Sequence, residues 1–157
     1  MKEEYIDIIS EAGKSLLESI TGFDIQVKKA YKRDNPYYSD NVAIMITLLG
    51  SIRGHAVLTL NGEFACKIAS AMMCGLEVNE LDDMGKSALA ELGNMVMGNC
   101  GTQLSQKGLF IDIGPPSVLI GEKMEISFDK MAIITIPFIF NENEKEKVEL
   151  NISYSEE

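Results

Sequence analysis

The sequence has no tryptophan, one histidine, three cysteines and four prolines. One histidine and three cysteines, with no Cys-x-x-Cys pair among them, are too few ligands for a zinc or iron site. We therefore expect this chain to hold no metal of its own. The odd cysteine count, together with the lack of a recognisable signal peptide, predicts reduced thiols in a cytoplasmic protein.

Basic residues are also scarce, because 14 lysines and arginines face 24 aspartates and glutamates, for a formal net charge of −10. Such a surface repels the phosphates of nucleic acids and of anionic lipids, so we expect neither as a partner. No apolar run approaches the roughly 20 residues needed to span a bilayer. A protein partner with a basic patch fits the charge better, although the acidity can equally serve solubility alone.

The length of 157 residues corresponds to one ordinary domain, residues 1–157. Hydrophobic periodicity predicts helices over residues 2–20, 63–73 and 81–104, with Gly22 ending the first and Asn61 and Asn79 capping the others. Strands are predicted over 23–30, 42–49, 54–60, 109–113, 117–120, 125–140 and 147–154, with Lys130 and Pro137 interrupting the long one. Residues 32–41 and 141–146 are expected to be polar loops. This order predicts an α+β fold.

The long helix presents two distinct faces when its residues are placed at steps of about 100°. The expected core face consists of Ala88, Leu89, Leu92, Met95, Val96 and Asn99. Ser87, Glu91, Asn94 and Gly98 fall together on a narrow polar arc. Glu91 and Asn94 are three residues apart, so their side chains are neighbours. Gly98 has no side chain, which leaves room for another molecule to approach the helix backbone.

The many weak helix formers of this segment, which include Gly93, Asn94 and Gly98, allow two interpretations. In the structural one, the glycines permit tight packing and Asn94 is only solvated. In the functional one, the Asn94 amide holds a water in line with a phosphorus atom, and Glu91 anchors a cationic group of a partner. If Glu91 and Asn94 are both buried and bonded internally, the functional interpretation fails.

Glu91-Leu-Gly-Asn94, preceded by Ser87, resembles the Asp/Ser-x-x-x-Glu-x-x-Asn signature of the CheC/CheX/FliY phosphatases of bacterial chemotaxis. The glycine-punctuated strand over residues 50–60, the order of elements and the prolines Pro115 and Pro116 are similar to the family as well. The resemblance implies a CheC/CheX-like sheet of about six strands with helices packed on it, in two pseudo-repeated halves. The first helix offers Asp7, Glu11 and Lys14, with lysine where the signature has asparagine, which favours the single-site CheX branch.

The resemblance also implies a function, namely hydrolysis of the aspartyl phosphate on a CheY-type response regulator. Asn94 is then expected to orient the attacking water and Glu91 to pair with the regulator's active-site lysine, while Ser87 and Gly98 contact the partner. Mg²⁺ is expected to be held by the regulator, and the CheX branch implies a homodimer joined through its sheets. The alternative is a non-catalytic adaptor of the same fold that binds a response regulator or another chemotaxis protein through the same helix.

Three other features are expected to be structural. His55 is predicted to be a satisfied histidine on the strand over residues 54–60. Cys100 lies beside the apolar arc without a base nearby, which argues against a catalytic thiolate. The acidic end, Glu156 and Glu157, is expected to fray.

Overall fold

The computed structural model describes residues 1–155, so the predicted fraying of Glu156 and Glu157 lies outside the described residues. Within them the chain forms three helices, α1 (Glu3–Thr21), α2 (Gly62–Met72) and α3 (Asp83–Ser105). The strands are β1 (Ile25–Val27), β2 (Tyr31–Arg33), β3 (Tyr37–Ser39), β4 (Val42–Gly50), β5 (Gly54–Leu60), β6 (Ile111–Ile113), β7 (Ser117–Ile120), β8 (Met124–Ile126), β9 (Ala132–Phe140) and β10 (Asn143–Tyr154).

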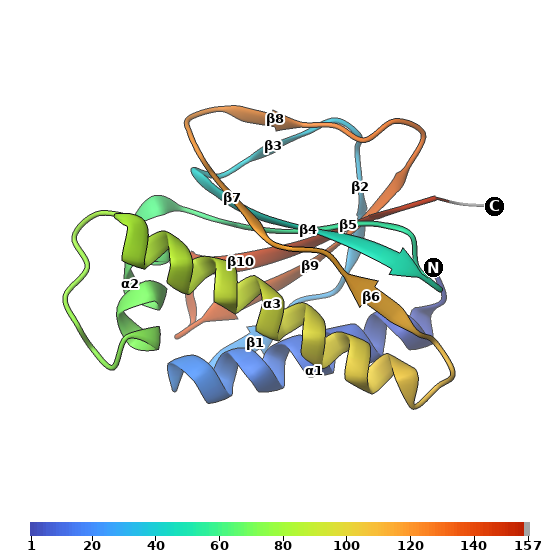
Figure 1. Cartoon of the computed structure of the whole chain (residues 1–157), viewed down its shortest axis with the longest axis horizontal. Coiled ribbons are helices and arrows are strands. Elements are labelled where there is room, and N and C mark those ends of the chain that lie inside the picture. The colour runs from blue at the N-terminus through green and yellow to red at the C-terminus, as the bar shows by residue number, and fades with distance from the viewer. Residues whose placement is uncertain (156–157) are drawn as a thin grey trace.

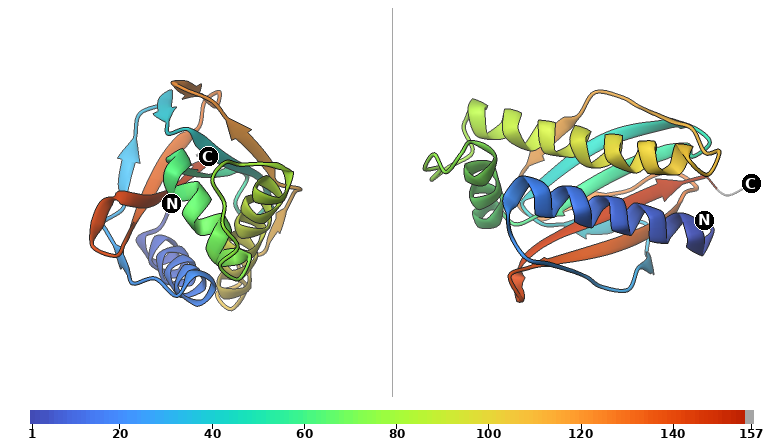
Figure 2. Two further views of the ribbon diagram at one scale, coloured as in Figure 1. Left: turned by 90° about the vertical axis from the view of Figure 1, so that its left-hand side faces the viewer. Right: turned by 90° about the horizontal axis from the view of Figure 1, so that it is seen from below.

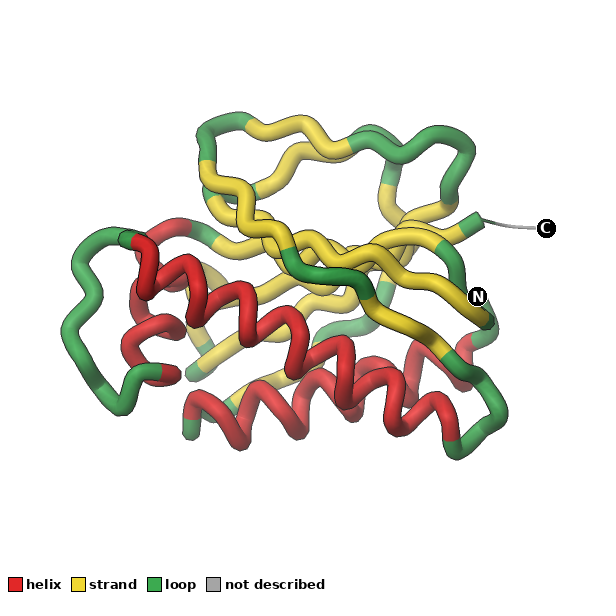
Figure 3. Tube along the Cα trace, in the orientation of Figure 1, coloured by secondary structure: helices red, strands yellow, loops and turns green. Residues whose placement is uncertain are grey.

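An antiparallel sheet of eight strands forms the centre of the molecule. The order is β1-β9-β10-β5-β4-β6, with β2 also pairing with β9 and β7 also pairing with β4. The eight strands therefore occupy six positions, where about six strands were expected. The helices cover one face, and the separate two-stranded ribbon β3–β8 lies over the other (Figure 1 and Figure 3). The α+β prediction is confirmed, with a long helix preceding a run of strands twice.

Three predicted boundaries are wrong because long-range pairing decides them. The expected loop over residues 32–41 contains β3 and most of β2. β3 pairs with β8 and β2 pairs with β9, about 85 to 105 residues away in the sequence. The single strand predicted over residues 125–140 is divided into β8 and β9, with Lys130 in a left-handed conformation between them. The polar loop over residues 141–146 shrinks to a two-residue turn, because Asn141 and Glu142 both take a positive φ that suits a tight hairpin.

Strand β9 continues through Pro137, contrary to the predicted interruption. The carbonyl of Pro137 accepts from the backbone N–H of Lys28 (2.9 Å), which lies in the gap between β1 and β2. In a strand the N–H and C=O of one residue point to the same side, so the missing N–H of Pro137 also faces this gap. The proline therefore costs the sheet no regular ladder bond.

The main core lies between the three helices and the sheet, and its largest fully buried side chains come from both layers: Phe138, Phe140, Ile9, Leu17, Ile44, Ile46, Leu48, Leu58, Leu60, Ile68, Leu89 and Leu92. A smaller cluster under the β3–β8 ribbon contains Tyr37, Ala43, Val57, Ile126 and Ile133. Helices α1 and α3 run antiparallel beside each other on the sheet (Figure 2). α3 therefore has one flank on α1 and its underside on the sheet, with its outer side free of other elements.

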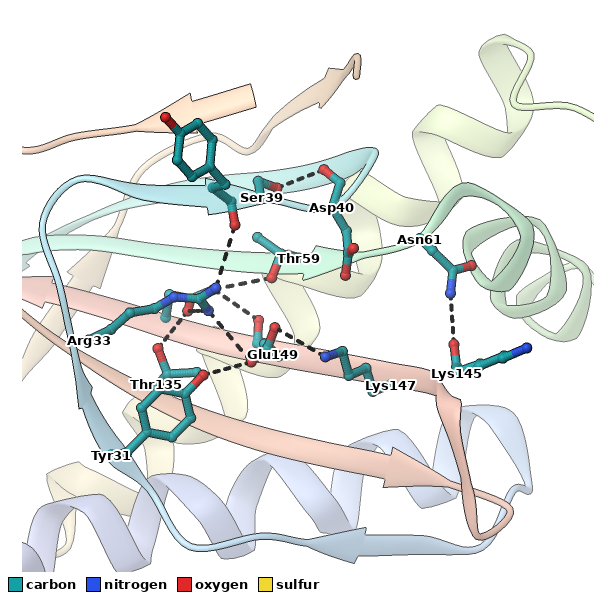
Figure 4. Close-up of polar contacts among 12 residues, drawn as sticks. Tyr31, Arg33, Ser39, Asp40, Thr59, Asn61, Thr135, Lys145, Lys147 and Glu149 are labelled. Atoms are coloured by element: carbon teal, nitrogen blue, oxygen red, sulfur yellow. Dashed lines mark hydrogen bonds and ion pairs between the residues drawn. The ribbon is translucent and has the colours of Figure 1, made fainter. Parts of the chain in front are cut away.

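The opposite face of the sheet carries a network of polar side chains that we call the outer-face network, made up of Tyr31, Arg33, Thr59, Thr135, Glu149 and Asn151 (Figure 4). The fully buried Asn151 amide donates to the carbonyl of Val57 (3.0 Å) and accepts from Thr135 Oγ1 (2.7 Å) and Arg33 Nη1 (3.0 Å). The Glu149 carboxylate accepts a hydrogen bond from the Tyr31 hydroxyl (2.9 Å). The pKa of Tyr31 is raised, mainly by burial and in second place by the negative charge of Glu149. These polar groups satisfy one another, as buried polar groups must.

Candidate functional site

Helix α3 begins at a side-chain cap and is anchored along its length. Asp82 Oδ1 accepts from the backbone N–H of Gly85 (2.9 Å), so Asp82 is the N-cap rather than the predicted Asn79. The predicted caps of the other helices are confirmed, with Asn61 accepting from Phe64 N–H and Gly22 ending α1 in the left-handed conformation.

Glycine 93 allows α3 to lie close against the sheet. A Cβ atom at this position would lie 2.7 Å from Ile44 Cγ2 and 3.0 Å from Ile46 Cδ1, which is closer than side-chain atoms pack. A Cβ atom on Gly101 would lie 3.2 Å from Ile111 Cγ1, a tight contact but a less severe one. The structural interpretation of the glycines is therefore correct for these two positions.

The flank of α3 that faces α1 is held by two bonds. Asn99 Nδ2 donates to the carbonyl of Ala12 (3.0 Å), and Cys100 Sγ lies 3.8 Å from the carbonyl of Ile9. Burial raises the pKa of the Cys100 thiol to about 12. The thiol is therefore protonated at neutral pH, and it cannot act as a nucleophile.

The buried side of α3 differs from the predicted core face. Leu89, Leu92 and Val96 are buried as predicted, but so are Gly93, Met97 and Cys100, whereas Met95 is 37% exposed. The difference arises because glycine adds nothing to a hydrophobic pattern, yet its small size decides which side of the helix approaches the sheet.

The predicted polar arc faces outward, as expected. Ser87 and Glu91 are exposed, and Asn94 and Gly98 are half-buried. Within residues 1–155, the side chains of Ser87, Glu91 and Asn94 make no hydrogen bond or ion pair. Nothing lies within 4 Å of a Cβ built on Gly98, so close packing does not explain this glycine. The arrangement presents a carboxylate and a carboxamide, side by side, to a second molecule.

The corresponding residues of α1 are placed differently. Asp7 and Glu11 are exposed and line a cleft between α1 and α3 that Asn99 and Gln103 complete, whereas Lys14 is not among its lining residues. Lys14 is half-buried and stands where the signature has asparagine, so α1 offers no carboxamide three residues after Glu11.

Comparison with known proteins decides the family. The family model described as "Chemotaxis phosphatase CheX" matches residues 42–139, which include α3 and its outward arc. The chain belongs to the CheX family. A curated relative from Thermotoga maritima, named CheY-P phosphatase CheX, is 37% identical over 106 residues, which cover 66% of this chain and 67% of the relative.

Solved CheX structures share the whole fold. One from Desulfovibrio desulfuricans has a TM-score of 0.84 at 23% identity, covering 97% of this chain and 99% of its own. Another, from Borrelia burgdorferi, is described as a CheX-CheY-BeF3-Mg²⁺ complex, with a TM-score of 0.82 at 28% identity, covering 97% of this chain and 98% of its own.

The remaining expectations concern metals, membranes and His55. The described residues contain no group of three or more His, Cys, Asp or Glu side chains arranged to hold a metal ion. None of the helices within residues 1–155 is long and apolar enough to cross a membrane. His55 is not satisfied as predicted, because its ring stacks on Phe128 with centroids 4.5 Å apart while its buried Nδ1 atom has no hydrogen-bond partner within the described residues.

The sequence pattern did not single out Met84 and Met95 as surface residues of the site. Both are exposed large apolar side chains on α3. Met84 lies seven residues before Glu91 and Met95 four residues after it. This helical spacing places both methionines on the same side of the helix as Glu91 and could have identified them from the sequence.

Proposed function

We propose that this protein hydrolyses the aspartyl phosphate of a CheY-type response regulator. The observation that carries the proposal is the outward, unpartnered pair Glu91 and Asn94 on α3, which is free to enter another protein's active site. Membership of the CheX family, the name of the Thermotoga relative and the description of the Borrelia complex support it.

Asn94 has the task of orienting water in this reaction. Its amide presents an acceptor and a donor together but cannot titrate, so it positions a water molecule rather than deprotonating it. The water oxygen bonds to phosphorus while the bond from phosphorus to the aspartyl oxygen breaks, which releases inorganic phosphate and restores the aspartate carboxylate. Phosphoryl transfer depends mainly on such positioning and on charge stabilisation.

Glu91 has the task of docking. Its carboxylate is exposed and has no cation beside it within the described residues, so it is available to a lysine of the regulator's active site. A charge-assisted hydrogen bond of this kind fixes the approach of α3 to the phosphorylated aspartate. Mg²⁺ is held by the regulator and neutralises the phosphoryl oxygens, while Ser87 and Gly98 lie against the regulator's surface.

The decay of the regulator's aspartyl phosphate in Mg²⁺ tests the proposal directly. Decay of a phosphorylated CheY-type regulator from the same cell is expected to accelerate with the wild-type protein and to return to the intrinsic rate with Asn94→Ala. Glu91→Gln is expected to weaken binding as well as turnover. A wild-type protein that binds the regulator without accelerating decay would contradict catalysis and establish the adaptor in its place.

The homodimer and the cytoplasmic location are part of the same proposal. The sheet ends in an edge formed by β6 and β7, and Leu119 and Ile120 of β7 are exposed there, which suits pairing with a second copy. Sedimentation velocity is expected to show a dimer that Leu119→Lys weakens, and a monomer at all concentrations would contradict it. A cytoplasmic location is expected because the proposed substrate is a response regulator.

A further inference from the structure

Two exposed methionines flank the polar pair on α3. Met84 is 61% exposed and Met95 37% exposed, and among the helices within residues 1–155 only α3 carries exposed large apolar side chains. At about 1.5 Å per residue, Met84 lies about 10 Å before Glu91 and Met95 about 6 Å after it along the helix axis. At about 100° per residue, both lie within about 40° of Glu91 around that axis.

The fold itself does not account for these methionines. The outer side of α3 is not covered by another element (Figure 2). Alanine, lysine or glutamate would support the helix equally well, because their helix propensities equal or exceed that of methionine. A single exposed apolar side chain needs no explanation. Within residues 1–155, however, the helices carry two such side chains, and they lie on either side of Glu91 along α3.

A partner that docks over Glu91 and Asn94 approaches the same side of α3 that carries both methionines. For the two side chains to reach a phosphorylated aspartate, the partner's surface must come into contact with α3, and the adjoining turns of the same stripe then lie against it. Gly98 leaves the helix backbone open beside Met95, which permits close contact there. Methionine suits such a surface, since its unbranched, polarisable side chain adapts to the shape of the partner.

We infer that Met84 and Met95 form an apolar docking surface for the receiver domain of the CheY-type response regulator, in contact with the surface beside its phosphorylated aspartate. The inference rests on the proposed function and names the residues that hold the partner rather than those that act on it. Met84 and Met95 provide affinity, and Asn94 provides turnover. The two roles are separable because the methionines bury apolar area equally in the ground state and in the transition state.

Binding and turnover are therefore measured separately. The probe is the CheY-type regulator activated with BeF3⁻ and Mg²⁺, in which BeF3⁻ stands in for the phosphoryl group. Met84→Ala and Met95→Ala are each expected to raise the Kd for this probe about fivefold to tenfold, as residues near the centre of an interface do. The decay rate of the phosphorylated regulator at saturating concentrations of each variant is expected to stay within about twofold of wild type.

Tyr38→Ala is the matched control. Tyr38 is 67% exposed but lies on β3, on the far side of the sheet from α3, so its removal is expected to leave Kd unchanged (Figure 1). Because the contact is apolar, the ratio of mutant to wild-type Kd is expected to be the same at low and high salt.

Two outcomes would overturn the inference, and they differ. If both methionine variants bind the activated regulator like wild type while Asn94→Ala still abolishes turnover, the docking surface is wrong and the proposed function stands. If the wild-type protein fails to bind the activated regulator at all, the proposed function and the docking surface fail together.

Discussion

Gly98 and Gly93 lie on the same helix and are predicted to respond differently to alanine. A Cβ at Gly98 meets nothing within 4 Å, and its φ is not in the left-handed region, so Gly98→Ala adds a methyl group without a clash. Alanine exceeds glycine in helix propensity by about 0.8–1.0 kcal/mol in a helix interior. Gly98→Ala should therefore raise the free energy of unfolding by about that amount. In a domain of this size that corresponds to a Tm increase of about 2–4 °C.

Gly93→Ala provides the control for stability. Its Cβ would lie 2.7 Å from Ile44 Cγ2, so either α3 or the sheet must move. Overpacking of this kind costs about 1–3 kcal/mol. Gly93→Ala is therefore expected to leave the free energy of unfolding unchanged if the cost is near 1 kcal/mol, and to lower it if the cost is larger. Urea unfolding of both variants, followed by circular dichroism, compares the two changes in the free energy of unfolding directly.

The functional result is the decisive one for Gly98. A more stable protein that is a poorer phosphatase is expected, because the added methyl group occupies the space that the regulator's surface needs. Gly98→Leu, which fills more of that space and keeps the helix, should weaken binding of the BeF3⁻-activated regulator about tenfold or more, which corresponds to about 1.4 kcal/mol. If Gly98→Ala and Gly98→Leu bind and turn over like wild type, no partner lies against this part of α3 and the reasoning is wrong.

Three further predictions concern the fold. Asn61→Ala should lower the free energy of unfolding by about 1 kcal/mol in urea titrations, because Asn61 caps α2 and also donates to the carbonyl of Lys145 (2.7 Å); an unchanged midpoint would contradict the capping role. Asn151→Ala should cost about 2–3 kcal/mol, since it leaves the buried carbonyl of Val57 without this donor, and Ser39→Ala on the exposed ribbon serves as its control. Burial lowers the pKa of His55 below its ordinary value of 6.5, so on acidification the unfolded chain takes up the proton before the folded one. The free energy of unfolding should therefore fall as the pH drops below about 6.5. His55→Phe should remove this part of the pH dependence, and a variant with the same pH profile as wild type would contradict the role of His55.

The sequence predicted the elements with strong local patterns and missed those that depend on distant partners. The strand over residues 54–60 and the caps Asn61 and Gly22 are local features, and all three are confirmed. By contrast, Tyr31–Arg33 and Tyr37–Ser39 are strands only because β9 and β8 supply their hydrogen bonds, which no pattern within residues 32–41 reveals.

The polar face of the candidate site was predictable because its side chains follow helical spacing. The outward position of Glu91 and Asn94 follows from one arc of α3, and the structure agrees. The exposure of Met95 was not predictable from hydrophobicity, because the orientation of α3 depends on Gly93 against Ile44, a contact between segments about 50 residues apart.

The buried amide of Asn151 has a consequence for how the strands find their partners. In β10, apolar Val148, Leu150 and Ile152 alternate with polar Glu149, Asn151 and Ser153. This alternation opposes a slip of one residue, since every side chain would change faces, but a slip of two residues keeps it intact. Such a slip would move the Asn151 amide away from Thr135 on β9 and from the carbonyl of Val57 on β5. Its N–H donors and its oxygen acceptor would then be buried without hydrogen-bond partners, which is costly. A single polar side chain thus distinguishes the native alignment of three adjacent strands from one that hydrophobic contacts alone would accept.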